Sequence, residues 1–251
     1  LMSSLTATQL QQQYIAYFGR PGDPAGIKYW LDSGITEANF AATIHAQDEY
    51  KTSTVGSKST EDQIDGLYQN LFGRSADAGG LIYWTVEVEA GRKSLGDLAV
   101  DLIYSTENPT AGNEDQAAAD KAVLDAKVKS AIAFTADIEA DTSLIKAYQP
   151  ESEGDTFVVG KALTSAKTWL TGITSTEATA AEVDAATNNV LTANDAVVVA
   201  VPTYSVATDV SSVDEGGTVT TTVTTTDVAE GTTLYWEVSG TGITATDFAA
   251  S

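Results

Sequence analysis

Several kinds of residue are absent or scarce in this sequence. It contains no cysteine, which excludes disulfide bonds, thiolate metal sites and a thiol nucleophile among these 251 residues. Its single histidine, His45, excludes a multi-histidine metal site or a histidine relay. Only 13 Lys and Arg residues stand against 35 Asp and Glu residues, which gives a formal net charge of −22. Such a surface repels nucleic acid and anionic headgroups, because phosphate binding needs clustered basic residues.

Long apolar runs are also missing. No run approaches the roughly 20 residues that a membrane helix needs, so we predict no transmembrane segment. The opening stretch, LMSSLTATQL, lacks both the basic segment and the apolar run of a secretory signal. We therefore expect any export of the protein to use a route that does not read an N-terminal signal.

One motif occurs twice in the sequence. YFGRPGDPAGIKYW at 17–30 aligns with LFGRSADAGGLIYW at 71–84 at a constant offset of 54 residues (72 − 18). Recurrence of rare residue types at a fixed offset indicates a duplicated supersecondary unit. The matched positions are Phe18 and Phe72, Gly19 and Gly73, Arg20 and Arg74, Asp23 and Asp77, Tyr29 and Tyr83, and Trp30 and Trp84.

Each copy is predicted to form three short helices. The motif glycines stand where a helix end favours a left-handed residue. The motif aspartates are suited to cap the next helix, and Pro24 falls at its first position, where a missing N–H costs nothing. The third helices are expected to begin near Thr36 and Ser94.

The motif has a structural interpretation and a functional one. A phosphate loop would need a Lys-Ser or Lys-Thr pair, and neither follows Arg20 or Arg74. We predict instead that these arginines bond helix-end carbonyls or the capping aspartate. The paired Tyr-Trp residues are predicted to anchor a small core. The alternative is that they are exposed and form a face on which sugars stack.

The middle of the chain is predicted to be helical and the end to be β. We expect a long helix over about 116–148, then helices over about 156–172 and 176–193. Three acidic residues at the start of this region are read as part of a solvated face: Glu114, Asp115 and Asp120.

From residue 203 the chain has no Lys or Arg and is rich in threonine, with alternation typical of strands. The stretch to Ser251 holds about four strands, fewer than the roughly seven of an immunoglobulin-like sandwich, so this β domain is expected to be incomplete. Asp214, Glu215 and Asp247 lie in its turns and are weak candidates for Ca²⁺ ligands, with solvated turns as the simpler alternative.

The residues quoted above resemble known families. The duplicated Phe-Gly-Arg…Tyr-Trp pattern resembles a helical domain of unknown function found in bacterial, notably cyanobacterial, surface-layer (S-layer) and type I secreted proteins. VDEGGTVTTTVTTT, within 203–251, is similar to Calx-β repeats of large cell-surface proteins. The resemblance implies an α + β multidomain chain: duplicated helical units over 1–110 (about 9–50 and 61–106), a further helical region over 111–196, and an Ig-like β-sandwich, cut short, over 203–251.

The resemblance also implies a function. It favours a structural, extracellular cell-surface protein that self-assembles into a Ca²⁺-dependent lattice or filament. Its helical domain would anchor to outer-membrane lipopolysaccharide or to neighbouring subunits. A carbohydrate-binding adhesin that uses the Tyr-Trp faces is the alternative. A phycobilisome-linker-like scaffold ranks lower because such linkers tend to be basic, and an enzyme ranks lowest because no catalytic signature surrounds His45.

Overall fold

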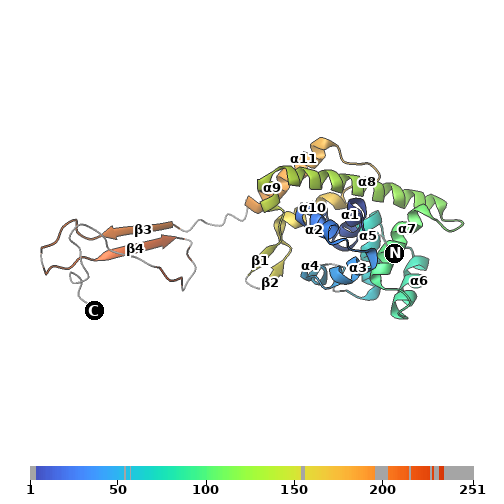
Figure 1. Ribbon diagram of the computed structural model, residues 1–251, viewed down its shortest axis with the longest axis horizontal. Coiled ribbons are helices and arrows are strands. Elements are labelled where there is room, and N and C mark those ends of the chain that lie inside the picture. The colour runs from blue at the N-terminus through green and yellow to red at the C-terminus, as the bar shows by residue number, and fades with distance from the viewer. Residues whose placement is uncertain are drawn as a thin grey trace. The chain divides into compact units, whose positions relative to one another are not determined.

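The chain divides into two compact units, residues 1–197 and residues 198–251. The first unit is helical apart from a short hairpin, and the described part of the second contains a two-stranded antiparallel sheet (Figure 1). The predicted class, a mainly helical N-terminal region followed by a β part, is therefore confirmed. The computed structural model describes residues 4–53, 55–56, 58–153, 156–195, 203–214, 216–226, 228 and 232–234.

Each copy of the motif joins the first two of three short helices. Thr36 and Ser94 are the N-cap residues of the third helices, as the sequence predicts. A short fourth helix follows in the first copy only. The first copy consists of α1 (Ala7–Phe18), α2 (Pro24–Ser33), α3 (Glu37–His45) and α4 (Asp48–Thr52). The second copy consists of α5 (Thr60–Phe72), α6 (Ala78–Glu89) and α7 (Leu95–Glu107).

The two copies share one hydrophobic core. α1 packs against α5, and the long helix α8 (Glu114–Ala140) crosses both of them (Figure 1). Polar bonds tie the helix ends together. The Asn70 side chain donates to the Ala16 carbonyl at 2.9 Å, and the buried Lys127 ammonium donates to the Asn70 carbonyl at 2.7 Å. The largest fully buried apolar side chains of this core include Leu10, Ile15, Phe40, Ile64, Leu67, Leu71 and Leu98.

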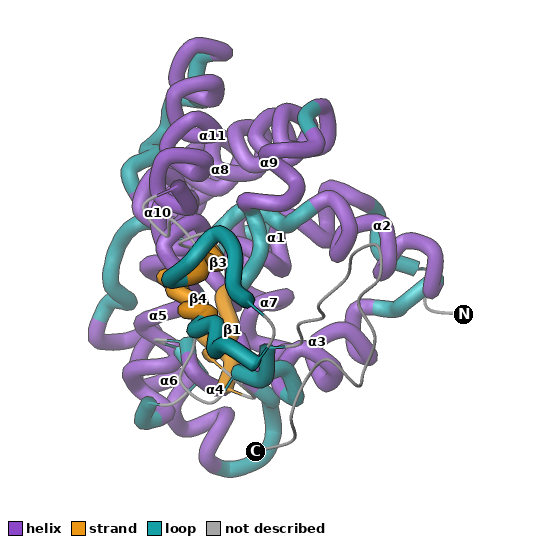
Figure 2. The backbone as a smooth tube through the Cα atoms, turned by 90° about the vertical axis from the view of Figure 1, so that its left-hand side faces the viewer, coloured by secondary structure: helices purple, strands orange, loops and turns teal. Residues whose placement is uncertain are grey.

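A second hydrophobic core lies at the other end of α8. It is formed where α8, α9 (Thr142–Ala147), α10 (Gly160–Thr171) and α11 (Ala180–Asp195) pack together (Figure 2). α8 contributes to both cores, with Leu124 and Val128 in the first and Phe134 and Ile138 in the second. This helix therefore connects the duplicated units to the rest of the helical region.

Two predicted boundaries in this region are wrong. The helix expected over 116–148 is broken at Asp141, whose carboxylate accepts a hydrogen bond from the Ser143 N–H at 2.7 Å and so starts α9. The next helix was expected from about residue 156. Instead β1 (Glu151–Glu153) and β2 (Thr156–Val158) form an antiparallel hairpin, and α10 begins only after it.

The second unit is described over one hairpin. β3 (Thr203–Thr208) pairs with β4 (Thr221–Thr226) in a register that sets Val206 opposite Val223. Most of the stretch from 227 to 251 lies outside the described residues, and with it the other strands that the sequence predicts. None of the described helices is both long enough and apolar enough to cross a bilayer.

Candidate functional site

The duplicated motif forms the same corner in both copies. α1 ends at Gly19 with φ 66° and α5 ends at Gly73 with φ 68°, a left-handed conformation that glycine adopts without steric cost. The Asp23 carboxylate accepts a hydrogen bond from the Gly26 N–H at 2.7 Å, and Asp77 caps α6 in the same way at 2.8 Å. These are the capping positions that the sequence predicts.

Arg20 is buried inside the first corner, with 4% of its surface exposed. Its Nε and Nη2 donate to the two carboxylate oxygens of Glu49, in α4, at 2.6 and 2.8 Å. Its Nη1 donates to the Pro21 carbonyl at 2.9 Å. The guanidinium carbon lies 5.3 Å from the ring centroid of Tyr14 and 5.5 Å from that of Phe18, within cation–π range.

Arg74 repeats this arrangement in the second corner. Its Nε and Nη2 donate to the carboxylate of Asp120, in α8, at 2.7 and 2.6 Å, and its Nη1 donates to the Ser75 carbonyl at 3.0 Å. The guanidinium carbon lies 5.1 Å from the Tyr68 ring centroid and 5.9 Å from that of Phe72. Both arginines are thus held by a forked ion pair, a backbone carbonyl and two equivalent aromatic rings, and Arg20 has a third ring, that of Tyr148, at 5.6 Å.

The two carboxylates correct the prediction made for the arginines. Helix-end carbonyls or the capping aspartate were expected as partners; Asp23 does lie within ion-pair range of Arg20, at 3.8 Å, but the closer bonds go to Glu49. The partners come from outside the motif, and they follow Arg20 and Arg74 by 29 and 46 residues respectively. A constant offset in the sequence therefore does not reveal them. The assignment of Asp120 to a solvated face is also wrong, because it is 7% exposed.

A second pair of equivalent contacts lies beneath each corner. The Gln11 amide oxygen accepts a hydrogen bond from the Gly22 N–H at 2.9 Å, and the Asp65 carboxylate accepts one from the Ala76 N–H at 2.9 Å. In the first copy the Gln11 amide also donates to the Thr135 hydroxyl of α8 at 2.7 Å. Asp65 follows Gln11, and Ala76 follows Gly22, at the same offset as the motif, although the residue types differ.

The paired aromatic residues divide between core and surface. Trp30 and Trp84 are partly buried and pack against the core, with the Trp30 and Phe40 ring centroids 5.2 Å apart. Tyr29 and Tyr83 are 64% and 56% exposed. The prediction that these tyrosines anchor the core is wrong. In each copy the tyrosine points outward, and only the tryptophan packs against the core.

A cleft lies beside each arginine. The first has a volume of about 290 Å³ and the second of about 150 Å³. Arg20 and Arg74 line them, but each guanidinium is already neutralised by its forked carboxylate. An anion would have to displace that carboxylate, so the clefts are poorly suited to bind phosphate.

A further cleft lies between α3 and α7, the third helices of the two copies. Its volume is about 450 Å³, and it is lined by Glu37 and His45 on one side and by Lys93, Asp97 and Asp101 on the other. Burial lowers the pKa of His45, so its imidazole is neutral at pH 7. The His45 Nε2 atom is buried without a hydrogen-bond partner in the described part of the chain.

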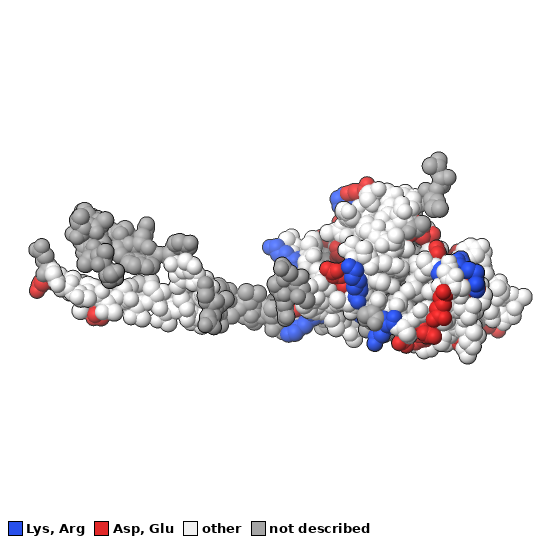
Figure 3. All heavy atoms as spheres, turned by 90° about the horizontal axis from the view of Figure 1, so that it is seen from below, with Lys and Arg blue, Asp and Glu red and all other residues white. Residues whose placement is uncertain are grey.

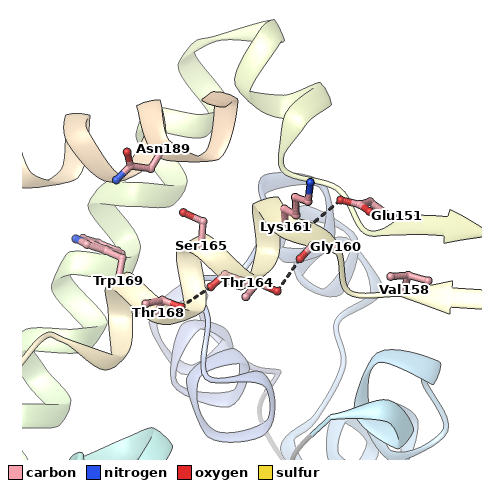
Figure 4. A pocket seen from close by; sticks show the side chains of 9 residues that line it. All are labelled: Glu151, Val158, Gly160, Lys161, Thr164, Ser165, Thr168, Trp169 and Asn189. Atoms are coloured by element: carbon pink, nitrogen blue, oxygen red, sulfur yellow. Dashed lines mark hydrogen bonds between the residues drawn. The ribbon is translucent and has the colours of Figure 1, made fainter. Parts of the chain in front are cut away.

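A larger cleft, of about 690 Å³, lies along α10. The Glu151 carboxylate accepts a hydrogen bond from the Lys161 N–H at 2.9 Å and so fixes one wall. The Thr164 and Thr168 hydroxyls donate to carbonyls one turn earlier, which leaves their oxygens available as acceptors. Side chains from β1, β2, α10 and α11 line this cleft: Glu151, Val158, Lys161, Thr164, Ser165, Thr168, Trp169 and Asn189 (Figure 4).

The three candidate calcium ligands are only partly described. Asp214 is exposed in the connection between β3 and β4. Glu215 and Asp247 lie outside the described residues. Within the described ranges, no three histidine or acidic side chains converge where they could hold a metal ion.

Comparison with known families matches residues 39–111 to a domain of unknown function, DUF4214. The match runs from α3 to just past α7, so it includes the second copy of the motif and omits the first. The chain therefore contains a DUF4214 domain over these residues, and the description of that domain assigns it no activity. No curated protein and no solved structure matches this chain.

Proposed function

We propose that this chain is the N-terminal part of a structural, S-layer-like cell-surface protein. One observation carries the proposal: in both copies the motif arginine is held by a forked carboxylate, a backbone carbonyl and at least two aromatic rings. A ligand would have to displace these internal partners, so the arginines fit a structural joint better than a ligand site. The duplicated units accordingly serve as a rigid scaffold.

Composition supports an extracellular, assembled protein. The chain lacks cysteine, carries a net charge of −22 and is rich in threonine from residue 203 onward. On the face shown in Figure 3, basic side chains lie beside acidic ones in small groups and form no continuous basic surface. We propose that Ca²⁺ bridges carboxylates within or between subunits, since carboxylate oxygens are ligands that Ca²⁺ prefers.

We propose that the cleft at α10 holds the polysaccharide to which the helical region anchors. Hydroxyl and amide groups hydrogen-bond sugar hydroxyls, and an indole can cover the apolar face of a sugar ring. The cleft offers Thr164, Thr168 and Asn189 for the first role. Trp169, whose indole is stacked on Phe134 with ring centroids 5.2 Å apart, would use its other face for the second. The ammonium of Lys161 would pair with the phosphate or carboxylate groups of lipopolysaccharide.

Binding of purified lipopolysaccharide tests this anchoring. The full chain is incubated with lipopolysaccharide aggregates and sedimented, and the bound fraction is measured for the Lys161→Glu and Asn189→Ala variants. Each should bind at least about tenfold more weakly, which is the loss of one charged or buried polar contact. Lys129→Glu, an exposed position outside the cleft, is the matched control. Equal binding by all the proteins would reject the anchoring site.

Chelation tests the calcium part of the proposal. Intact cells that carry the protein are treated with EDTA and then with excess Ca²⁺. Release of the protein by EDTA and its return with Ca²⁺ would support bridging by Ca²⁺. A protein that stays assembled and equally stable would show that the calcium part is wrong.

A carbohydrate-binding adhesin is the second candidate. The exposed tyrosines favour it, because Tyr29 and Tyr83 present aromatic rings to solvent at equivalent positions of the two copies. Each lies edge-on to its tryptophan, with ring centroids 4.8 and 4.9 Å apart. A folded Tyr29→Ala, Tyr83→Ala double variant that loses glycan binding would favour the adhesin over the scaffold.

A further inference from the structure

Two buried polar atoms beside the cleft between α3 and α7 have no hydrogen-bond partner in the described part of the chain. One is the Nε2 atom of His45, a residue that lines the cleft. The other is the hydroxyl oxygen of Tyr17, which is 1% exposed. A Cβ added to Gly96, also in the lining, would lie 3.5 Å from that hydroxyl. The two rings contact each other, with centroids 5.5 Å apart, so both polar groups border one cleft, which we call the α3–α7 cleft.

The second copy has apolar side chains at the two equivalent positions. The motif offset of 54 (71 − 17) pairs Tyr17 with Leu71, and the N-caps of the third helices, 58 residues apart (94 − 36), pair His45 with Ile103. Leu71 is buried in the shared core, and Ile103 packs against it. A buried polar group without a partner destabilises a fold, and the duplicate shows that the architecture needs none at either position. A bound ligand would supply the partners that Tyr17 and His45 lack.

The charges in the lining favour a cation as that ligand. The carboxylates of Glu37, Asp97 and Asp101 outnumber the ammonium of Lys93, so the ionised side chains sum to −2 (1 − 3). Lys93 pairs with Asp101 at 2.6 Å, and Asp97 caps α7 through one oxygen, Oδ2. Glu37 has no ion pair among the described residues, and burial raises the pKa of its carboxyl group. A positively charged group beside Glu37 would stabilise the ionised carboxylate.

We propose that the α3–α7 cleft binds an aliphatic polyamine, a linear molecule with an ammonium at each end and methylene groups between. Glu37 and His45 stand eight residues apart (45 − 37), which is about 12 Å along α3. The Glu37 carboxylate accepts hydrogen bonds from one ammonium. The neutral imidazole of His45, protonated on Nδ1, accepts one from a second ammonium through Nε2. Ala41 and Ala42 lie between these residues and line the cleft, where they leave room for the methylene groups.

The Tyr17 hydroxyl suits the Glu37 end of this ligand. Burial raises the pKa of the hydroxyl, and Tyr50, Asp97 and Glu37 raise it further, so the group stays protonated. Its oxygen would accept a hydrogen bond from the ammonium that Glu37 holds, since an ammonium has three protons to donate. The α3–α7 cleft shares no lining residue with the cleft along α10, so this ligand does not depend on the proposed anchoring.

A second cleft extends the site past Glu37. It has a volume of about 270 Å³ and shares Glu37 and Val100 with the α3–α7 cleft. Its further charged groups are two carboxylates and one ammonium, and its lining includes the amides of Gln9 and Gln12, whose oxygens are acceptors. A longer polyamine would find partners for a third ammonium there, and should bind more tightly than a short diamine.

Calorimetric titration of the full chain at constant ionic strength tests the proposal, with spermidine, putrescine, butylamine and butanediol as probes. Spermidine should bind most tightly and putrescine next. Butylamine, with one ammonium, and butanediol, with none, should bind at least about tenfold more weakly than putrescine, the loss expected for one charged contact. Melting temperatures should rise in the same order, because a ligand of the folded chain stabilises it. No binding of either polyamine, or equal binding of butylamine or butanediol, would overturn the proposal.

A pair of glutamate variants locates the binding. Glu37→Gln should weaken putrescine binding at least about tenfold, whereas Glu61→Gln, the matched control, should leave it unchanged. Glu61 is an exposed glutamate in the first turn of α5, as Glu37 is a half-buried one in the first turn of α3. Equal binding by both variants would show that the amines follow only the net charge of the chain, and the proposal would fail.

Tyr17→Phe separates a ligand from an ordered water molecule, because the change removes only the hydroxyl. Without amine the variant should melt at or above the temperature of the wild type, since an unpartnered buried group is lost. With spermidine its melting temperature should rise less than that of the wild type. A variant that melts lower without amine, and gains as much with it, would show that water already satisfies the hydroxyl and that the cleft holds no polyamine.

Discussion

Replacing Glu49 by glutamine tests whether the first corner is a joint held by charge. The change keeps the shape of the side chain and one acceptor oxygen but removes the charge that neutralises Arg20. The Arg20 side chain is 5% exposed and that of Glu49 is 16% exposed. Water therefore has little access to the guanidinium once its partner is lost.

The equivalent change in the second corner, Asp120→Asn, provides the comparison for the expected loss of stability. Breaking a buried ion pair on one side costs about 3–5 kcal/mol, and we expect this range for Glu49→Gln. The Arg74 side chain is 28% exposed, so water replaces part of the lost interaction. Asp120→Asn should therefore cost less, about 1–3 kcal/mol. In a region of this size each kcal/mol lowers the melting temperature by about 2–4 °C.

Urea unfolding followed by far-ultraviolet circular dichroism measures both losses. Asp32→Asn, which breaks the exposed pair with Lys28, is the control and should leave the midpoint unchanged. Replacing both partners, as Arg20→Met with Glu49→Gln, should recover much of the stability lost by Glu49→Gln alone. A smaller loss for Glu49→Gln than for Asp120→Asn would refute the reasoning from burial.

Three further predictions follow from burial and close packing. Burial lowers the pKa of Lys127 from 10.5 to about 8, so the folded chain disfavours its charged form. Stability should then rise by about 2 kcal/mol from pH 7 to pH 9.5 relative to a Lys127→Met variant, as read from urea midpoints. Burial also lowers the pKa of His45, so the wild-type chain should lose stability as the pH falls below about 6.5 and His45→Gln should lose less; thermal melts at pH 5.5 and 7.5 check this. A Cβ on Gly26 would lie 2.3 Å from the buried Tyr14 hydroxyl, but one on Gly80 would lie 3.2 Å from its nearest neighbour. Gly26→Ala should therefore destabilise by about 1–3 kcal/mol in urea unfolding, and clearly more than Gly80→Ala.

Local signals in the sequence predicted the corner geometry well. Gly19 and Asp23 follow rules that depend on a few neighbouring residues, and the repeat confirmed them independently at Gly73 and Asp77. The helix order of both copies follows from the same rules. The break at Asp141 was missed because apolar residues continue at helical spacing on both sides of it.

Partners that are distant in the sequence could not be predicted. Glu49 and Asp120 have no common spacing from their arginines, and an acidic residue in an acidic chain gives no sign that it is buried. The burial of Lys127 could not be predicted for the same reason, since its carbonyl partners lie 57 and 58 residues earlier. The outward direction of Tyr29 and Tyr83 was missed as well, because an aromatic pair in the sequence does not show which of its two rings enters the core.

The position of α8 has a consequence for the order in which the chain can fold. Synthesis completes α1 to α7 before α8, yet Asp120, Lys127 and part of the first core come from α8. Until that helix has left the ribosome, Arg74 has no carboxylate and the shared core of the two copies has an open side. The duplicated units therefore cannot reach their final state during their own translation. The helical region should instead complete its folding late, in a single step that follows the synthesis of α8.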